Sequence, residues 1–445
     1  MKITLPDHRS ILPHISAVRD FTIRILPYWI AAAMTALISI LYARVYLWSE
    51  QQTSQWSVVH PALGFLIIPL AFLGSSLLCR YLAPYASGSG IPQVIAALDA
   101  AKDPTSPLIS KLVGVRVIAV KFVSSCVCVM GGGAIGREGP TLQIAAGIFR
   151  FVEKRWAAIG TLNPQSMIMA GGAAGLASAF NTPLGGIIFA IEELAKVHIS
   201  HVRTTVFHAV IIAGILSQAV LGNYLYLGRV TLESGDAVTK IYLVLVMGVI
   251  GVIGALFGLF VVKAMDFRSL LSSNLKTAMT VACGLVVATM FYFGGQDSLG
   301  SGREIVIRLL SHPNDAIPAH LGFMRVLANY FAYIGGTAGG VFAPALASGA
   351  AFGGWASQFF AGASVQVWIL AGMVAFLTGV TRSPFTSMIL VIEMTDSHGV
   401  ILDLMLAAVM AQGAARFVDP LSFYEQLAHR MLHPPKIAPV TADAV

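Results

Sequence analysis

Charged residues are scarce in this sequence. Asp, Glu, Lys and Arg make up 11% of its 445 residues, whereas an ordinary soluble domain carries about 25%. Hydrophobic residues make up 56%, and the mean hydropathy is +0.78. These proportions exclude a soluble globular protein and predict an all-α, multi-pass protein of the lipid bilayer. The Lys and Arg residues stand singly between apolar runs, so the net charge of +7 does not indicate nucleic-acid binding.

Cysteine and metal-ligand patterns are also sparse. The four cysteines lie in apolar stretches without CxxC spacing, so we expect no disulfide and no metal: Cys79, Cys126, Cys128 and Cys283. His198 and His201 follow two glutamates, but not with the HExxH spacing of a metalloprotease. An intramembrane enzyme is therefore only a distant alternative, and we expect no cofactor.

Apolar segments of unequal length run through the chain. Some reach or approach the roughly 20 residues that cross a bilayer: Ile25–Trp48, Pro61–Cys79, Thr205–Leu221, Ile241–Val262 and Ala278–Phe293. Others are shorter, or are broken by Gly and Pro: Val117–Ile135, Thr141–Phe151, Met167–Ile191, Phe342–Phe360, Val367–Val380, Phe385–Ile392 and Ile401–Ala415. Broken helices are tolerated at membrane depth where their freed backbone groups line a cavity or bind a ligand, so we expect broken and re-entrant helices here.

The two halves of the chain resemble each other. Three pairs of stretches match in the same order at nearly constant separation: Gly88–Gly90 with Gly300–Gly302, Gly136–Pro140 with Gly340–Pro344, and Asn181–Glu192 with Arg382–Glu393. Such duplication is typical of transporters with a site at the repeat interface. Lys196, His198 and Arg203 follow the first-half glutamates, whereas Asp396 follows the second-half one. The positive-inside rule therefore predicts inverted repeats.

Three Gly-rich breaks share one pattern: Ser87–Pro92, Gly136–Pro140 and Gly340–Pro344. Each combines glycines with a proline and precedes an apolar helix, which leaves a helix N-terminus inside the membrane. Free N–H groups at such ends attract anions. Close helix packing is the alternative role for these glycines, but three breaks in a duplicated arrangement favour anion binding. A phosphate loop is excluded, because its lysine and its preceding strand are missing.

Arg137 and Glu138 lie within the second break, between long apolar stretches. Ionisable residues at membrane depth are expensive and indicate a substrate or ion pathway. An ionised carboxylate among helix N-termini can occupy an anion site and block it, and protonation then frees the site. The alternative is that Glu138 only caps a helix.

Together with Arg116–Phe122 and the following Gly131–Gly133, these stretches resemble the CLC chloride channel and transporter family from about Leu63 to Tyr424. The resemblance, closest in type to prokaryotic H+/Cl− exchangers, implies a homodimer with one anion pathway in each subunit. It implies residence in a bacterial inner (plasma) membrane with both termini cytoplasmic. We expect a cytoplasmic helix over 1–24, a first repeat over 25–222, an extracellular linker over 223–240, a second repeat over 241–428, and a cytoplasmic tail over 429–445 without CBS domains.

The resemblance also implies roles for individual residues. Ser89 and Tyr424 correspond to hydroxyl ligands of the central anion, to which Val341 and Phe342 add backbone amides. Amides around Arg137, Glu138 and Gly139 form the outer site, and Glu138 is the gate and proton acceptor. The alternative role of Tyr424 is an interfacial anchor. The glycines that support these turns are Gly88, Gly90, Gly136 and Gly340.

Glu193 discriminates between two mechanisms. Coupled exchangers of the family carry a glutamate here as the internal proton site, and channels carry an apolar residue; a solvated helix end beside Lys196 is the structural alternative. Glu192 has a supporting role. Lys121 either raises the local potential for anions or extends to the membrane surface. Gln93 replaces a glutamate common in the family.

The sequence therefore predicts a secondary active transporter that exchanges chloride for protons. A passive, voltage- or pH-gated chloride channel of the same fold is the alternative. Ser89, in place of the proline of nitrate-preferring relatives, favours chloride. The Gly-Ser-Gly and Gly-Arg-Glu-Gly-Pro patterns differ from those of the fluoride-exporting branch.

Overall fold

The computed structural model describes residues 23–160, 162–195, 204–222, 225–230, 232, 235–360 and 362–433. Most of the expected N-terminal helix, part of the expected linker and most of the expected tail lie outside these residues. Lys196, His198, His201 and Arg203 lie outside them as well. The described residues are mainly helical, and their only β-type pairings are two isolated bridges.

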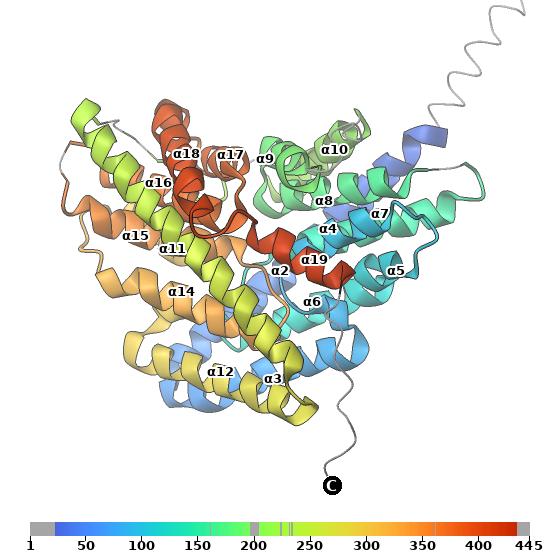
Figure 1. Ribbon diagram of the computed structural model, residues 1–445, viewed down its shortest axis with the longest axis horizontal. Coiled ribbons are helices and arrows are strands. Elements are labelled where there is room, and N and C mark those ends of the chain that lie inside the picture. Colours follow the sequence, from blue (N-terminus) through green and yellow to red (C-terminus); the bar gives the residue numbers. More distant parts are fainter. Residues whose placement is uncertain are drawn as a thin grey trace, which may run out of the picture.

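The helices divide between the two halves of the chain (Figure 1). The first half contains α2 (Leu26–Val59), α3 (Gly64–Leu82), α4 (Ile91–Ala100), α5 (Pro107–Val113), α6 (Val115–Met130), α7 (Glu138–Trp156), α8 (Pro164–Phe180), α9 (Pro183–Phe189) and α10 (Thr204–Leu221). The second half contains α11 (Ala237–Leu270), α12 (Ser273–Gly294), α13 (Arg303–Ser311), α14 (Ala319–Ile334), α15 (Phe342–Ser357), α16 (Val365–Thr381), α17 (Pro384–Thr395) and α18 (Ile401–Arg416). Helix α19 (Phe423–Leu432) follows them.

The two halves meet across a local two-fold axis. Gly136 and Gly340, which are equivalent in the repeat, pair antiparallel through two hydrogen bonds of 2.8 and 2.7 Å between their amide nitrogens and carbonyl oxygens. An antiparallel pair of equivalent residues reverses the chain direction of one half relative to the other. The repeats are therefore inverted.

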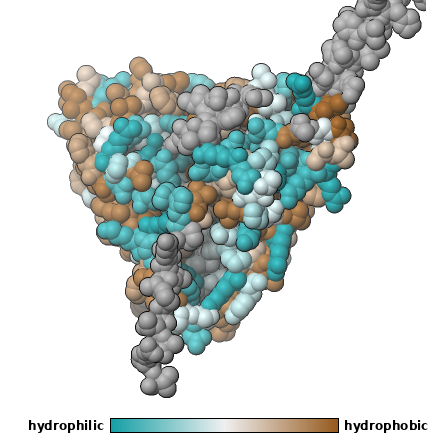
Figure 2. Space-filling model, turned by 45° about the vertical axis from the view of Figure 1, so that its right-hand side comes forward, coloured by the Kyte–Doolittle hydropathy of each residue, from teal (hydrophilic) through white to brown (hydrophobic). Residues whose placement is uncertain are grey.

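The centre of the molecule is formed by short helices of both repeats. Every residue of α8 is buried, as are nearly all residues of α15 and α16. Large apolar side chains are exposed instead on the outer helices α2, α3, α11, α12 and α18. In the face shown in Figure 2, hydrophobic residues lie along the sides and hydrophilic residues gather in the middle. This distribution is that of a protein with a lipid-facing belt.

Seven helical segments within the described residues are long and apolar enough to cross a membrane. Helices α2 and α11 have 34 residues each, or about 50 Å at 1.5 Å per residue. That length exceeds a hydrocarbon core of about 30 Å, so both helices either tilt or extend beyond the core. Helix α11 runs diagonally across Figure 1.

Two segments differ from the sequence expectation. The spans Pro107–Met130 and His398–Arg416 are long enough to cross the membrane, although apolar length alone predicted short pieces there. In the first span α5 precedes α6 almost without interruption, and in the second a short turn precedes α18. Helix α11 also begins at Ala237, several residues before the apolar run from Ile241.

Candidate functional site

The three Gly-rich breaks converge at the centre of the molecule. At Gly90 the backbone is left-handed (φ 108°), and an added Cβ atom would lie 2.5 Å from the carbonyl oxygen of Gly139. A Cβ atom at Gly139 would lie 2.6 Å from the Ser89 hydroxyl oxygen. At Gly340 a Cβ atom would lie 3.1 Å from the Gly139 nitrogen. Glycine is therefore required where the starts of α4, α7 and α15 meet.

Two buried hydroxyl groups face each other at this point. The Ser89 and Tyr424 side chains are fully buried, and neither hydroxyl oxygen has a hydrogen-bond partner among the described residues. The two side chains lie within interaction distance of each other. Buried polar groups are normally satisfied, so this pair indicates a ligand that accepts hydrogen bonds. Because Tyr424 is buried, it is not an interfacial anchor.

Val341 and Phe342 form the start of α15 beside these hydroxyls. Val341 is the N-cap residue and Phe342 the first helical residue, and N–H groups in a first helical turn have no partner within the helix. The Phe342 ring stacks on Tyr424 with a centroid distance of 6.2 Å and an interplanar angle of 9°. The structure thus brings the predicted hydroxyl and amide donors to one place.

Polar side chains fix the turn that carries Ser89. Lys121 is fully buried and donates from Nζ to the Gly88 carbonyl oxygen over 2.7 Å, so it does not extend to the membrane surface. Gln93 Oε1 accepts from the Gly90 amide at 2.9 Å, and Gln93 Nε2 donates to the Ser87 carbonyl oxygen at 2.6 Å. An amide side chain provides both a donor and an acceptor, whereas an ionised glutamate in its place would only accept.

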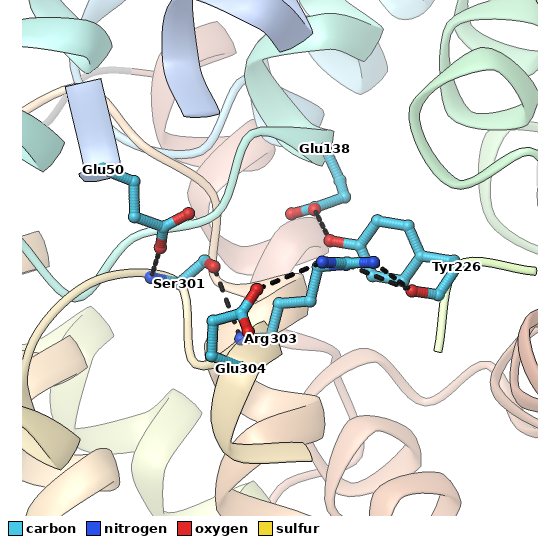
Figure 3. A network of polar contacts seen from close by, with 6 residues as sticks. All are labelled: Glu50, Glu138, Tyr226, Ser301, Arg303 and Glu304. Atoms are coloured by element: carbon cyan, nitrogen blue, oxygen red, sulfur yellow. Dashed lines mark hydrogen bonds and ion pairs between the residues drawn. The ribbon is translucent and has the colours of Figure 1, made fainter. Parts of the chain in front are cut away.

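Glu138 is the first residue of α7 and is fully buried. Its Oε1 accepts a hydrogen bond from the Tyr226 hydroxyl at 3.3 Å (Figure 3). Its Oε2 lies over Gly136, where any side chain would collide with it, and the carboxylate faces the amide of Ala343 at the start of α15. The carboxylate therefore lies between the N-termini of two helices, which is a position suited to an anion.

Arginines line a pocket beside the segment that carries this carboxylate. The Arg137 guanidinium donates to the Ala179 carbonyl oxygen at 3.2 Å and lies 5.7 Å from the centre of the Tyr226 ring. A pocket of about 260 Å³ is lined by Arg44, Arg137 and Arg303 among its residues. Three guanidinium groups around one pocket create a positive potential that attracts anions.

Glu193 is buried, with 2% of its surface exposed, and accepts a hydrogen bond from the Ser383 hydroxyl at 2.6 Å. It lies in a π-helical turn, η3 (Ala190–Leu194), within electrostatic range of Tyr424. Its burial is incompatible with a solvated helix end. Glu192 points elsewhere and accepts from the Thr386 and Phe385 amides at 2.6 and 3.2 Å, so it caps α17.

The equivalent turn of the second half holds a carboxylate of the chain. The Ser301 amide, the counterpart of that of Ser89, donates to Glu50 Oε1 at 2.6 Å (Figure 3). Arg325, fully buried, donates to the Gly300 and Leu299 carbonyl oxygens at 2.9 and 2.8 Å and holds this turn in place. The Ser89 amide donates to the Tyr333 hydroxyl instead, so the two matching turns have different partners.

The sequence reasoning missed three residues of this region. Tyr226 contacts Glu138, Ser383 contacts Glu193, and the Tyr333 hydroxyl accepts a hydrogen bond from the Ser89 amide at 3.3 Å. Tyr226 lies between the repeats, and no local motif marks it. The pairing of Ser383 with Glu193 had one signal, because Ser383 lies in the second-half counterpart of the stretch that immediately precedes Glu193. Within the described residues, no group of three or more His, Cys, Asp or Glu could hold a metal.

Comparison with known proteins gives the family. Residues 70–416 match the family described as voltage gated chloride channel. The chain belongs to this family. Its members transport ions, and the chain is accordingly not an enzyme. Two curated relatives, from Citrobacter koseri and Klebsiella pneumoniae, are named H(+)/Cl(-) exchange transporter ClcA, and each is 28% identical to this chain. The alignments cover 91% of this chain and 87% and 88% of the two relatives, respectively.

Solved structures of other members of the chloride channel family share the fold. A slow cyanobacterial Cl−/H+ antiporter has a TM-score of 0.78 at 22% identity, with 92% of this chain and 98% of that chain covered. A eukaryotic CLC transporter has a TM-score of 0.76 at 20% identity, with coverages of 94% and 75%. A CLC-type fluoride/proton antiporter has a TM-score of 0.76 at 17% identity, with coverages of 91% and 97%. At these identities the likeness shows the fold alone.

Proposed function

We propose that this protein exchanges chloride for protons, with Glu138 as the anion gate and proton acceptor and Glu193 as the internal proton site. The observation that carries the proposal is the position of the buried Glu138 carboxylate beside the site formed by the Ser89 and Tyr424 hydroxyls and the start of α15. A carboxylate that can block the site and a set of hydrogen-bond donors that can bind an anion are thus neighbours in the buried centre of the molecule.

The chemistry of this arrangement suits chloride. Hydroxyl groups and helix N-terminal amides attract an anion without holding it as tightly as a fixed positive charge would. Ionised Glu138 competes with chloride, because both are negative and both are stabilised by the same amides. When Glu138 binds a proton its charge is lost, and chloride takes its place. The same event loads a proton, which links the two movements.

Glu193 supplies a second buried carboxylate near Tyr424. Tyr424 lies within electrostatic range of both Glu138 and Glu193. A proton can therefore be held at a buried carboxylate that an anion does not need to visit. The Ser383 hydroxyl donates to Glu193 and thereby orients it. The printed names of the curated relatives also support exchange over passive conduction.

Location and assembly follow from the same proposal. The bacterial relatives and the inverted repeats favour an inner-membrane protein with both termini in the cytoplasm, and we expect a homodimer with one pathway per subunit. Light scattering of the detergent-purified protein measures the subunit number. A monomeric mass would contradict the dimer while leaving the transport proposal intact.

A coupled flux measurement in liposomes tests the function. An imposed chloride gradient should drive protons uphill, with chloride and pH followed in the same sample. Chloride flux without proton movement at any pH would identify a passive channel instead. Absence of chloride flux, with the protein shown to be folded and inserted, would contradict both.

A further inference from the structure

Tyr226 covers the Glu138 carboxylate from the segment between the two repeats. Its side chain is buried, with 4% of its surface exposed, and its hydroxyl points at Glu138 Oε1 from 3.3 Å (Figure 3). The two residues are 88 positions apart in the sequence. The segment that connects the repeats thus places a hydrogen-bond donor beside a carboxylate buried in the first repeat.

Both repeats hold Tyr226 in this position. From the second repeat, Arg303 donates from Nε and Nη2 to the Tyr226 carbonyl oxygen at 3.1 and 2.8 Å, and its guanidinium lies 5.0 Å from the ring centre. From the first repeat, Phe180 packs edge-on against the ring at 5.2 Å, and Arg137 lies near its face. The adjacent Leu227 amide donates to the Met394 carbonyl oxygen at 3.1 Å. The ring is therefore placed by several independent contacts.

The contacts of the Tyr226 backbone and ring explain where the residue lies, but they do not require a hydroxyl group on the ring. Phenylalanine would make the same ring contacts with Phe180, Arg137 and Arg303. The hydroxyl adds one specific interaction, the hydrogen bond to Glu138. A phenol donates more strongly to an ionised carboxylate than to a neutral acid. The bond therefore stabilises one charge state of Glu138 over the other.

We propose that Tyr226 is a latch that holds ionised Glu138 in its blocking position, and that Arg303 fixes the latch. This inference rests on the proposed function, because it requires Glu138 to be the gate. Protonation of Glu138 weakens the bond and releases the carboxylate. The pocket lined by Arg44, Arg137 and Arg303 then receives the anion on the outer side. Tyr226 is a positioning residue, and it sets the pH at which the gate opens.

Other ionisable groups also surround the gate and contribute to its pH response. Arg137 lies next to Glu138 in the chain, and the other groups lie on three helices: Tyr42 and Tyr46 on α2, Arg303 on α13 and Tyr424 on α19. Glu50, also on α2, lies close to Tyr226. All of these groups are unchanged by a Tyr226→Phe substitution. That substitution removes one hydroxyl and retains the ring, so a change in pH response reports on the hydroxyl alone.

The test measures chloride-coupled transport in liposomes against pH for the wild type and Tyr226→Phe. Without the latch, ionised Glu138 is less strongly retained, so transport should reach half its maximum at a higher pH. The expected displacement is about one pH unit, the tenfold effect of removing a hydrogen bond to a charged group. The ratio of chloride to protons should stay unchanged. Tyr242→Phe is the matched control, because Tyr242 lies in α11 with its ring partly exposed and stacked on Phe360.

A double variant separates the latch from the gate. In the Glu138→Gln background, Tyr226→Phe should have no further effect on pH dependence, because the latch acts only through Glu138. A wild-type pH profile for folded Tyr226→Phe overturns the latch and leaves the gate intact. If Glu138→Gln itself retains a wild-type pH dependence, the proposed function fails instead.

Arg303→Lys provides a second test should Tyr226→Phe fail to fold. Lysine keeps the positive charge but cannot make the two-pronged contact with the Tyr226 carbonyl oxygen. We expect a displacement in the same direction as for Tyr226→Phe, again absent in the Glu138→Gln background. An unchanged profile for Arg303→Lys, with the protein folded, overturns the role of Arg303 in the latch.

Discussion

Glu192 and Glu393 each cap the helix that belongs to the other repeat. Glu393 accepts from the Gly185 and Leu184 amides at 2.6 and 3.1 Å, at the start of α9, while Glu192 caps α17, which carries Glu393. Helix α17 and the segment formed by α9 and η3 therefore lie antiparallel, each with its acidic end at the other's N-terminus. The reciprocal contact joins the two inverted repeats and gives the glutamates a structural role.

Neutralising either cap should weaken the junction between the repeats without uncoupling transport. Glu192→Gln and Glu393→Gln each lose charge-assisted hydrogen bonds to helix N-terminal amides, at a cost of about 1 kcal/mol. The measurement is the thermal unfolding midpoint in detergent, together with the ratio of chloride to protons in liposomes. If Glu192→Gln removes proton movement and leaves the midpoint unchanged, Glu192 belongs to the proton route rather than to the junction.

Glu138→Gln should make chloride flux independent of pH and abolish proton movement. Glutamine is similar in shape to a protonated glutamate, so it neither competes with chloride as an anion nor carries a proton. Chloride efflux from liposomes over a range of pH, with pH recorded outside, measures both properties. Persistence of coupled proton movement in this variant would contradict the gate. Glu153→Gln, at a carboxylate near the end of α7 that pairs with Arg150, is a suitable control.

Glu193→Gln should stop proton transport while chloride still passes. The substitution removes the titratable group but leaves a side chain of the same size beside Ser383. Parallel recordings of chloride and pH in liposomes distinguish the two ions. Ser383→Ala, which removes the donor but keeps the carboxylate, should slow proton movement without abolishing it. Unaltered proton transport in Glu193→Gln would remove Glu193 from the mechanism.

Removal of the central hydroxyls should weaken chloride binding. Ser89→Ala and Tyr424→Phe each delete one donor, which corresponds to an affinity loss of about three- to tenfold for a hydrogen bond of roughly 1 kcal/mol. Calorimetric titration of the purified protein with chloride measures this loss. Ser348→Ala is the matched control, because the Ser348 hydroxyl donates to the Pro344 carbonyl oxygen within α15. Equal affinities for all variants would place the anion elsewhere.

The broken helix ends were predictable because their cause is local. Glycines that permit a left-handed backbone and prolines that suit a first helical turn are visible in any sequence, and they marked Gly88–Gly90, Gly136–Pro140 and Gly340–Pro344. The duplication then predicted that these ends share a site. Length was less informative, because α5 and the turn before α18 extend spans that apolarity alone divides.

The partners of the key carboxylates were not predictable, because they are distant in sequence. Tyr226 reaches Glu138 from a segment without a motif, and Ser383 is 190 residues from Glu193. Only packing decides such contacts. The role of Glu192 shows the same limit, since a pair of adjacent glutamates in a sequence does not reveal which one caps a helix and which one is buried.

The Glu50–Ser301 contact gives a symmetric scaffold an asymmetric electrostatic field. In the second half, the amide of the Gly-Ser-Gly turn is neutralised by a carboxylate of the same chain. In the first half, the corresponding Ser89 amide donates to the Tyr333 hydroxyl, and the Ser89 hydroxyl has no partner among the described residues. Duplication therefore produced two equivalent turns with different roles: one holds a carboxylate of the chain itself, and the other carries the hydroxyl that we propose as a chloride ligand.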